Sequence, residues 1–200
     1  PNLHLQVIKV NSEDEKMIWL ATNMNDLPGT GLIYTGTRID TEVYSKWLQF
    51  VGINAIDYNA GFDAETRKDI ENGFMDNKWK CVVSTNALGM GIDKSDIRFI
   101  IHTQIPSSPI HYYQEIGRAG RDGKPTRIIL FFNENKDTNN GYAVDYQLPL
   151  SFIEGARPSE KKYSKVIARV QACPAGREDR QHKPERLRVR GGCPCCRRER

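Results

Sequence analysis

Apolar and polar residues follow one another along the first 135 positions in patterns that predict strands separated by helices. Residues 3–10 alternate between apolar and polar side chains, which is typical of a strand. Further strands are expected at 31–35, 52–58, 80–84, 98–103 and 126–132. The central ones are nearly continuous apolar runs, as expected when both faces of a sheet are covered.

Helical patterns lie between these strands. Ser12 is expected to cap one helix, with Glu15 three residues later completing a capping box, and Asp63 is expected to cap another. The residues expected on the buried sides of the helices are Met17, Ile18, Leu20 and Ala21, then Val43, Trp47, Phe50 and Val51, and finally Ile70 and Phe74.

Strands that alternate with helices predict right-handed βαβ units and a parallel sheet. We therefore expect an α/β domain with a doubly wound parallel sheet over residues 1–135. Residues 136–168 are expected to be a connecting segment and the start of a small following domain, with a helix at 159–170. Residues 169–200 contain nine arginines, against seven in the preceding 168 residues, and no periodic apolar pattern. This tail is either an arginine-rich arm that binds nucleic acid or a sequence foreign to the fold.

The positive net charge of the chain is concentrated in that tail. Residues 1–168 carry 19 Lys and Arg against 21 Asp and Glu, while residues 169–200 carry 10 against 4. Because the folded part is mildly acidic, any nucleic-acid site within it must be a local patch.

Membrane and secreted classes of protein are not expected. The chain has no run of eighteen apolar residues, and its beginning lacks the pattern of a signal peptide. Its five cysteines do not form a disulfide framework, which favours a reducing compartment. We expect a location in the cytoplasm, with the nucleoid, or in a nucleus.

Four polar segments directly follow predicted strands, at 35–38, 59–61, 84–86 and around 102–103. Ligands of doubly wound sheets gather at the carboxyl ends of the strands. Helix capping explains each segment taken alone. Together, the hydroxyl and amide side chains and the glycines predict a track for a nucleic-acid backbone.

Two glycine-containing segments carry further candidate chemistry. In Leu88-Gly-Met-Gly-Ile-Asp-Lys94, Asp93 could accept hydrogen bonds from a ribose hydroxyl; alone, the segment could be a surface turn in which Asp93 pairs with a lysine. In Tyr112-Tyr-Gln-Glu-Ile-Gly-Arg-Ala-Gly-Arg-Asp-Gly123, Arg118 and Arg121 lie three residues apart between glycines. Guanidinium groups bind phosphate with a planar fork, although a polar turn with two solvated arginines is the simpler interpretation.

In order and spacing, these segments are similar to the later motifs of superfamily 2 helicases. The sequences Gly-Met-Gly-Ile-Asp-Lys and Tyr-Tyr-Gln-Glu-Ile-Gly-Arg-Ala-Gly-Arg-Asp-Gly resemble the RecQ family of ATP-dependent DNA helicases. RNA helicases of the DEAD-box type usually have His-Arg where this chain has Gln114-Glu115. The resemblance covers about residues 1–135, and it implies the second RecA-like lobe of a two-lobe motor driven by ATP.

The resemblance implies a role for each matching residue. Arg121 would be the arginine finger that stabilises charge on the γ-phosphate, Arg118 would support the same phosphate, and Gln114 would couple the nucleotide to the motif. Asp93, with Gly91, would contact the ribose. The residues that would hold the DNA backbone are Thr37, Arg38, Gly61 and Thr85. The implied partners are single-stranded and partly duplex DNA and an N-terminal RecA-like lobe, which would hold most of the Mg²⁺ that accompanies ATP.

The chain also departs from the family. Asn59 stands where RecQ proteins usually have His, which weakens the assignment of that loop to DNA contacts. The last cysteines form a single CxxC pair, Cys193 and Cys196, so no zinc site is expected. Neither a GxxxxGK[ST] phosphate loop nor an Asp-Glu-x-His or Asp-Glu-x-Asp box occurs. We therefore expect no ATP hydrolysis by this chain alone. The alternatives are a non-catalytic module that binds nucleic acid and a lobe of an RNA helicase.

Overall fold

The computed structural model describes residues 2–86, 88, 92–135 and 145. All of them belong to one compact unit, residues 1–154. The expected helix at 159–170, the arginine-rich tail with its cysteines, and Gly91 lie outside the described residues.

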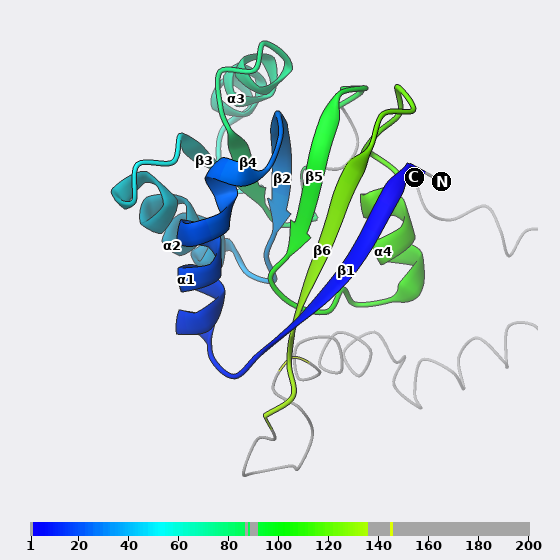
Figure 1. Ribbon diagram of the computed structural model, residues 1–200. Helices are drawn as coiled ribbons and strands as arrows, with labels where there is room; N and C mark the ends of the chain where they lie inside the picture. Colours follow the sequence, from blue (N-terminus) through cyan, green and yellow to red (C-terminus); the bar gives the residue numbers. More distant parts are fainter. Residues whose placement is uncertain (1, 87, 89–91, 136–144, 146–200) are drawn as a thin grey trace, which may run out of the picture. The chain divides into compact units, whose positions relative to one another are not determined.

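The described part of the chain is built on one sheet of six parallel strands (Figure 1). The strands are β1 (Leu3–Val10), β2 (Thr30–Tyr34), β3 (Ala55–Tyr58), β4 (Cys81–Ser84), β5 (Ile97–His102) and β6 (Thr126–Asn133). Their order across the sheet is β1-β6-β5-β2-β4-β3, with parallel pairing throughout. The prediction of a doubly wound parallel sheet is confirmed.

Helices cover both faces of the sheet. They are α1 (Glu13–Asn23), α2 (Arg38–Phe50), α3 (Ala64–Met75) and α4 (Pro109–Ile116), with a short 3₁₀ turn at Met24–Asp26 after α1. Ile33 of β2 packs in the core beneath α1 and α2, and its neighbour Leu32 packs on the opposite face with residues of α3 and α4. Figure 1 shows α1 and α2 on one side of the sheet and α4 on the other. None of the helices described is long and apolar enough to cross a membrane.

The predicted buried sides of the helices are wrong in part. Ile18 of α1 is 58% exposed, and in α2 Val51 packs against the core but two of the expected residues do not. Val43 and Phe50 are 44% and 83% exposed, whereas the buried residues are Thr41, Tyr44, Ser45 and Leu48. Hydrogen bonds make this possible, because the Thr41 hydroxyl donates to the Arg38 carbonyl and buried polar groups are tolerated once bonded. The helical period was correct, but Tyr44 and Leu48, together with the polar Thr41 and Ser45, face the core in place of Val43 and Phe50.

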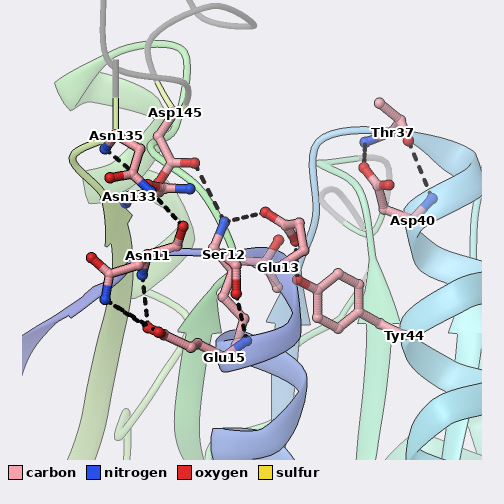
Figure 2. Close-up of polar contacts among 12 residues, drawn as sticks. Asn11, Ser12, Glu13, Glu15, Thr37, Asp40, Tyr44, Asn133, Asn135 and Asp145 are labelled. Carbon is pink, nitrogen blue, oxygen red and sulfur yellow. Dashed lines mark hydrogen bonds and ion pairs between the residues drawn. The ribbon is translucent and has the colours of Figure 1, made fainter. Parts of the chain in front are cut away.

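The N-termini of α1 and α2 are capped differently (Figure 2). The Ser12 hydroxyl accepts from the Glu15 N–H, as predicted, but the Glu15 carboxylate accepts from the Asn11 N–H at 2.7 Å instead of returning to Ser12. The capping box predicted for α1 is therefore only half formed. A complete box occurs at α2, where the Thr37 hydroxyl accepts from the Asp40 N–H and the Asp40 carboxylate accepts from the Thr37 N–H.

A polar network around the buried Lys16 joins the beginning of α1 to α2 and to the chain beyond β6; Asp145 is buried with it, whereas Glu13 is 60% exposed. We call its members, Glu13, Lys16, Tyr44 and Asp145, the Lys16 cluster. Lys16, expected nowhere in the core, is only 1% exposed, and its ammonium lies 2.6 Å from Glu13 Oε1 and 3.3 Å from Asp145 Oδ1. The Tyr44 hydroxyl donates to Glu13 Oε2, and the Asn133 N–H donates to Asp145 Oδ2, both at 2.6 Å. Figure 2 shows Asp145 beside Asn133 and Glu13 beside Tyr44.

Candidate functional site

The four predicted polar segments lie at one edge of the sheet, because they follow the adjacent parallel strands β5, β2, β4 and β3. Backbone hydrogen bonds join these loops where the strands end. The Thr35 N–H donates to the Ser84 carbonyl, and the Thr103 N–H donates to the Tyr34 carbonyl, both at 2.9 Å. The loop positions are therefore fixed by the strand pairing itself.

Arg38 and Gly61, two of the predicted DNA-binding residues, are in contact. The guanidinium group of Arg38 lies over Gly61 so closely that a Cβ atom there would be 2.0 Å from Nη2. Asn59 holds this loop, since its side-chain oxygen accepts from the Gly61 N–H at 2.9 Å. Thr37 precedes Arg38, and its hydroxyl is used by the α2 cap. Arg38 itself is exposed, so its positive charge is available at this edge.

Thr85 lines a separate small pocket at the same edge. The pocket has a volume of about 80 Å³, and its lining includes Thr35, Gly36, Thr85, Asn86 and Ser107, with Tyr34 and His102. Hydroxyl, amide and backbone groups surround it, which suits contacts to a phosphate or sugar. His102 and Thr103 were expected to lie along the track, but both are buried, and the imidazole of His102 contributes to the pocket lining beneath the surface.

The part of the glycine-rich turn that carries Arg121 is held at the opposite edge of the sheet. Helix α4 ends at Ile116, and the Gly120 N–H then donates to the carbonyl of Ile97, the first residue of β5. Gly120 has φ +59°, and a Cβ atom there would lie 2.6 Å from Asn2 Nδ2 and 2.7 Å from Thr126 Oγ1. A glycine is required for this tight turn.

Arg121 and Asp93, which lie 28 residues apart in the sequence, form an ion pair. Nη1 of Arg121 lies 2.5 Å from Asp93 Oδ1, and the two side chains are 42% and 87% exposed. The alternative that Asp93 pairs with Lys94 is wrong, because Lys94 is buried and pairs with Asp96 at 2.8 Å. The structure thus brings together, on the surface, the residue predicted to be the arginine finger and the residue predicted to contact the ribose.

A second ion pair secures the same turn. Arg98, in β5, forms two hydrogen bonds with the carboxylate of Asp122. The Arg98 guanidinium lowers the pKa of Asp122 to about 2, and the Lys124 N–H adds to this effect. The residue next to Arg121 is therefore clamped to the sheet, which limits where Arg121 can reach.

Arg118 lies on the inner side of the turn, close to Tyr34. Its Nε atom is buried and makes no hydrogen bond to any described residue. The Tyr34 hydroxyl is also buried and likewise has no hydrogen-bond partner of acceptable geometry in the described chain. Burial raises the pKa of Tyr34, and the nearby Arg118 charge opposes that rise. Gln114, one turn earlier on α4, is exposed.

Sequence reasoning missed a buried pair between His102 and Glu115. Nε2 of His102 lies 2.8 Å from Glu115 Oε2. The imidazole also stacks on Tyr34, with ring centroids 5.2 Å apart, and meets the edge of Tyr112 at 5.0 Å. Glu115 was noticed only as a departure from RNA helicases. No sequence pattern pairs the last residue of a strand with a helical residue thirteen positions later.

No group of three or more His, Cys, Asp or Glu side chains is placed to hold a metal ion within the ranges the structure describes. The CxxC pair, Cys193 and Cys196, lies outside those ranges.

The sequence motifs and the site geometry agree with a known family. Residues 15–123 match the model of the helicase conserved C-terminal domain. The chain belongs to this family. It is 38% identical over 134 residues to ATP-dependent DNA helicase Q5 of Rattus norvegicus and 36% identical over 133 residues to ATP-dependent DNA helicase RecQ of Bacillus subtilis; each match covers 66% of this chain. The predicted resemblance to RecQ-type DNA helicases is confirmed.

The helicase domain spans only part of these relatives. It covers 14% of the rat protein and 22% of the B. subtilis protein. A match to hus2/rqh1 of Schizosaccharomyces pombe, at 32% identity, extends over 98% of this chain and 15% of that protein.

Solved structures agree on the fold. The E. coli DEAD-box protein SrmB aligns with a TM-score of 0.63 over 67% of this chain and 79% of that one, and the Mycobacterium smegmatis helicase Lhr aligns with 0.56 over 65% and 19%. Both are 19% identical, so they support the RecA-like fold alone.

Proposed function

We propose that this domain is the second motor lobe of a RecQ-like ATP-dependent DNA helicase. It supplies the arginine finger for ATP hydrolysis and part of the track for single-stranded DNA, and it is inactive without a first lobe. The observation that carries this proposal is the Arg121–Asp93 pair, in which two distant motif residues meet on the surface beside a clamped turn. The named DNA helicases among its relatives support the choice of DNA.

The side chains near the turn fit a nucleotide. Arg118 and Arg121 offer guanidinium donors, the Nε atom of Arg118 has no hydrogen-bond partner in the described chain, and Asp93 offers a carboxylate for ribose hydroxyls. The Arg121–Asp93 pair is exposed, and exposed pairs contribute little stability, so Arg121 can leave Asp93 at low cost to bind a phosphate. Gln114 is exposed one turn before Arg118 and can donate its amide to the same ligand.

The division of labour follows from these positions. Arg121 adds positive charge next to the γ-phosphoryl group as its bond to the ADP leaving group breaks, and Arg118 holds the same γ-phosphoryl group in place. Asp93, with Gly91, orients the ribose. Mg²⁺, held mainly by the first lobe, neutralises phosphate charge when it is bound.

At the other edge, Arg38 binds a DNA phosphate beside Gly61, and Thr37 and Thr85 contact the same backbone. Contacts to phosphate and sugar carry no base preference, which suits a motor that moves along a strand. The lack of a side chain at Gly61 lets the guanidinium of Arg38 lie flat on the loop.

The test is ATP hydrolysis by this chain joined to a RecQ-type first lobe, with and without single-stranded DNA. We expect activity that rises with DNA and falls by about 10³-fold or more in Arg121→Ala, the scale that arginine fingers have in GTPases. Arg127→Ala is the matched control, because Arg127 is an exposed arginine of β6 whose side chain donates to the exposed side chain of Gln6, away from the glycine-rich turn. An inactive but folded two-lobe protein, or an unimpaired Arg121→Ala variant, would refute the proposal.

A further inference from the structure

We propose that His102 is a positioning residue that couples DNA binding to ATP hydrolysis through its contact with Glu115. This inference rests on the proposed function, and it concerns two residues outside the catalytic and DNA-binding sets described above. His102 lies between them in space, since the ring is in contact with helix α4 on one side and with the end of β2 on the other.

The contact toward the nucleotide side is the hydrogen-bonded pair with Glu115. Glu115 follows Gln114 directly and precedes Arg118 by three residues, so both lie within one turn of it. The Glu115 side chain is 13% exposed and the His102 side chain 2% exposed. In such a buried place, an interaction between an imidazole and a carboxylate is stronger than in water. A shift of α4 along the sheet would break it.

The contact toward the DNA side is the stack on Tyr34. Tyr34 is the last residue of β2, and the segment Thr35-Gly36-Thr37-Arg38 begins immediately after it. The next residue after His102, Thr103, binds the Tyr34 carbonyl through both its N–H and its hydroxyl, at 2.9 and 3.2 Å. The loop that carries Arg38 and the strand end that carries His102 therefore move together.

The remaining polar atom of the ring supports a functional use. Nδ1 of His102 is buried and has no hydrogen-bond partner among the described residues, although the ring lines the pocket that also contains Thr35 and Thr85. An unsatisfied buried nitrogen costs stability, and a purely structural His–Glu pair gains nothing from leaving one there. A DNA backbone at the pocket would lie against the loop that follows Tyr34, and the imidazole beneath that loop links it to Glu115.

The experiment measures three quantities separately: basal ATP hydrolysis, its stimulation by DNA, and the affinity for DNA. In the two-lobe protein, ATP hydrolysis is measured without DNA and with saturating oligothymidine, and the Kd for that strand is measured by fluorescence anisotropy. For His102→Phe, which retains a ring that can stack but cannot bond Glu115, we expect the stimulation by DNA to fall about tenfold, with basal hydrolysis and Kd changing less than about twofold. Ile110→Ala, at an exposed position of the same helix, is the control.

A structural role gives a different result. If His102 only held α4 on the sheet, basal hydrolysis, Kd and the free energy of unfolding would deteriorate together, and this outcome overturns the proposal. Unchanged stimulation overturns it as well. Glu115→Gln, which can still form a neutral hydrogen bond, provides a second variant if His102→Phe does not fold, and a partial loss of stimulation is expected.

A double-mutant cycle completes the test. Because His102 and Glu115 act through one contact, the double variant is expected to lose no more stimulation than His102→Phe alone, whereas additive losses overturn the inference. Failure of the proposed function is distinguishable, because then the unsubstituted two-lobe protein would hydrolyse no ATP.

Discussion

Two polar groups with buried members in this domain differ in how fully their hydrogen-bonding atoms are used. In the Lys16 cluster, the ammonium contacts two carboxylates, whose other oxygens accept from a phenol and a backbone N–H. Around α4, Tyr34 Oη, His102 Nδ1 and Arg118 Nε are buried without a hydrogen-bond partner in the described chain. Both groups are small and both lie next to helices, yet only the first is complete.

This difference distinguishes polar groups that stabilise the fold from polar groups that are available to a ligand. A buried charge network in which every group is satisfied makes the packing of its elements specific and has no atom left for a ligand. Unsatisfied buried atoms each cost about 1–3 kcal/mol, and where a fold retains them an unbound partner is a reasonable explanation. We infer that the Lys16 cluster fixes α1, α2 and Asp145 together, whereas the three atoms around α4 contribute no hydrogen bond to holding the described chain together.

The largest effect on stability is expected when the Lys16 cluster loses its lysine. Lys16→Ala leaves the buried carboxylate of Asp145 without its cation, and breaking a buried pair in this way destabilises a fold by about 3–5 kcal/mol. Urea unfolding of the chain, followed by circular dichroism, measures it.

Lys46→Ala is the control for that measurement. Lys46 forms an exposed pair with Glu42 four residues away on α2, so its loss is expected to leave the unfolding midpoint unchanged within error. Equal effects of the two substitutions would remove the distinction between a buried network and a surface pair.

Two tyrosines test the comparison most directly, because the same atom is removed from each group. Tyr44→Phe removes the buried hydroxyl that donates to the exposed carboxylate of Glu13 and is expected to cost about 0.5–1.5 kcal/mol. Tyr34→Phe removes a hydroxyl that has no hydrogen-bond partner in the described residues, so stability should stay the same or rise. The same unfolding measurement applies. A larger loss in Tyr34→Phe than in Tyr44→Phe would show that the α4 group is satisfied after all.

The smallest effect on stability is expected from the ion pair between Arg98 and Asp122, and this effect depends on pH. Because the Arg98 guanidinium lowers the pKa of Asp122 from 3.8 to about 2, the pair stabilises the folded chain above about pH 4, and this contribution is lost as the pH falls through about 2. Thermal unfolding of the wild type and of Asp122→Asn should therefore differ slightly at pH 5 and converge near pH 2. A difference independent of pH would mean that the ion pair contributes nothing.

Much of the fold and part of the site could be predicted from local patterns. Strand positions followed from short apolar runs, because both faces of a central parallel strand must be covered. The caps at Ser12 and Asp63 followed from residue types that bond the first free N–H groups of a helix. The meeting of four loops at one edge followed from parallel pairing alone.

Patterns failed where neighbours from distant parts of the chain decide what is buried. The apolar Val43 and Phe50 of α2 are exposed. Tyr44 is buried instead, and its hydroxyl donates a hydrogen bond to Glu13, thirty-one residues earlier. The buried Lys16 is paired with Glu13 on its own helix and with Asp145 from beyond β6. Such choices depend on partners that no local window contains.

The sequence by itself determined the order of the elements, the family and the candidate residues, since these depend on spacing along the chain and on the chemistry of each side chain. Only the tertiary structure decided which of those residues meet. It paired Arg121 with Asp93 and not Lys94 with Asp93, placed Arg38 against Gly61, and joined His102 to Glu115. The reason is physical: hydrogen bonds and ion pairs act over a few ångströms, and the sheet, not the sequence distance, sets which side chains come that close.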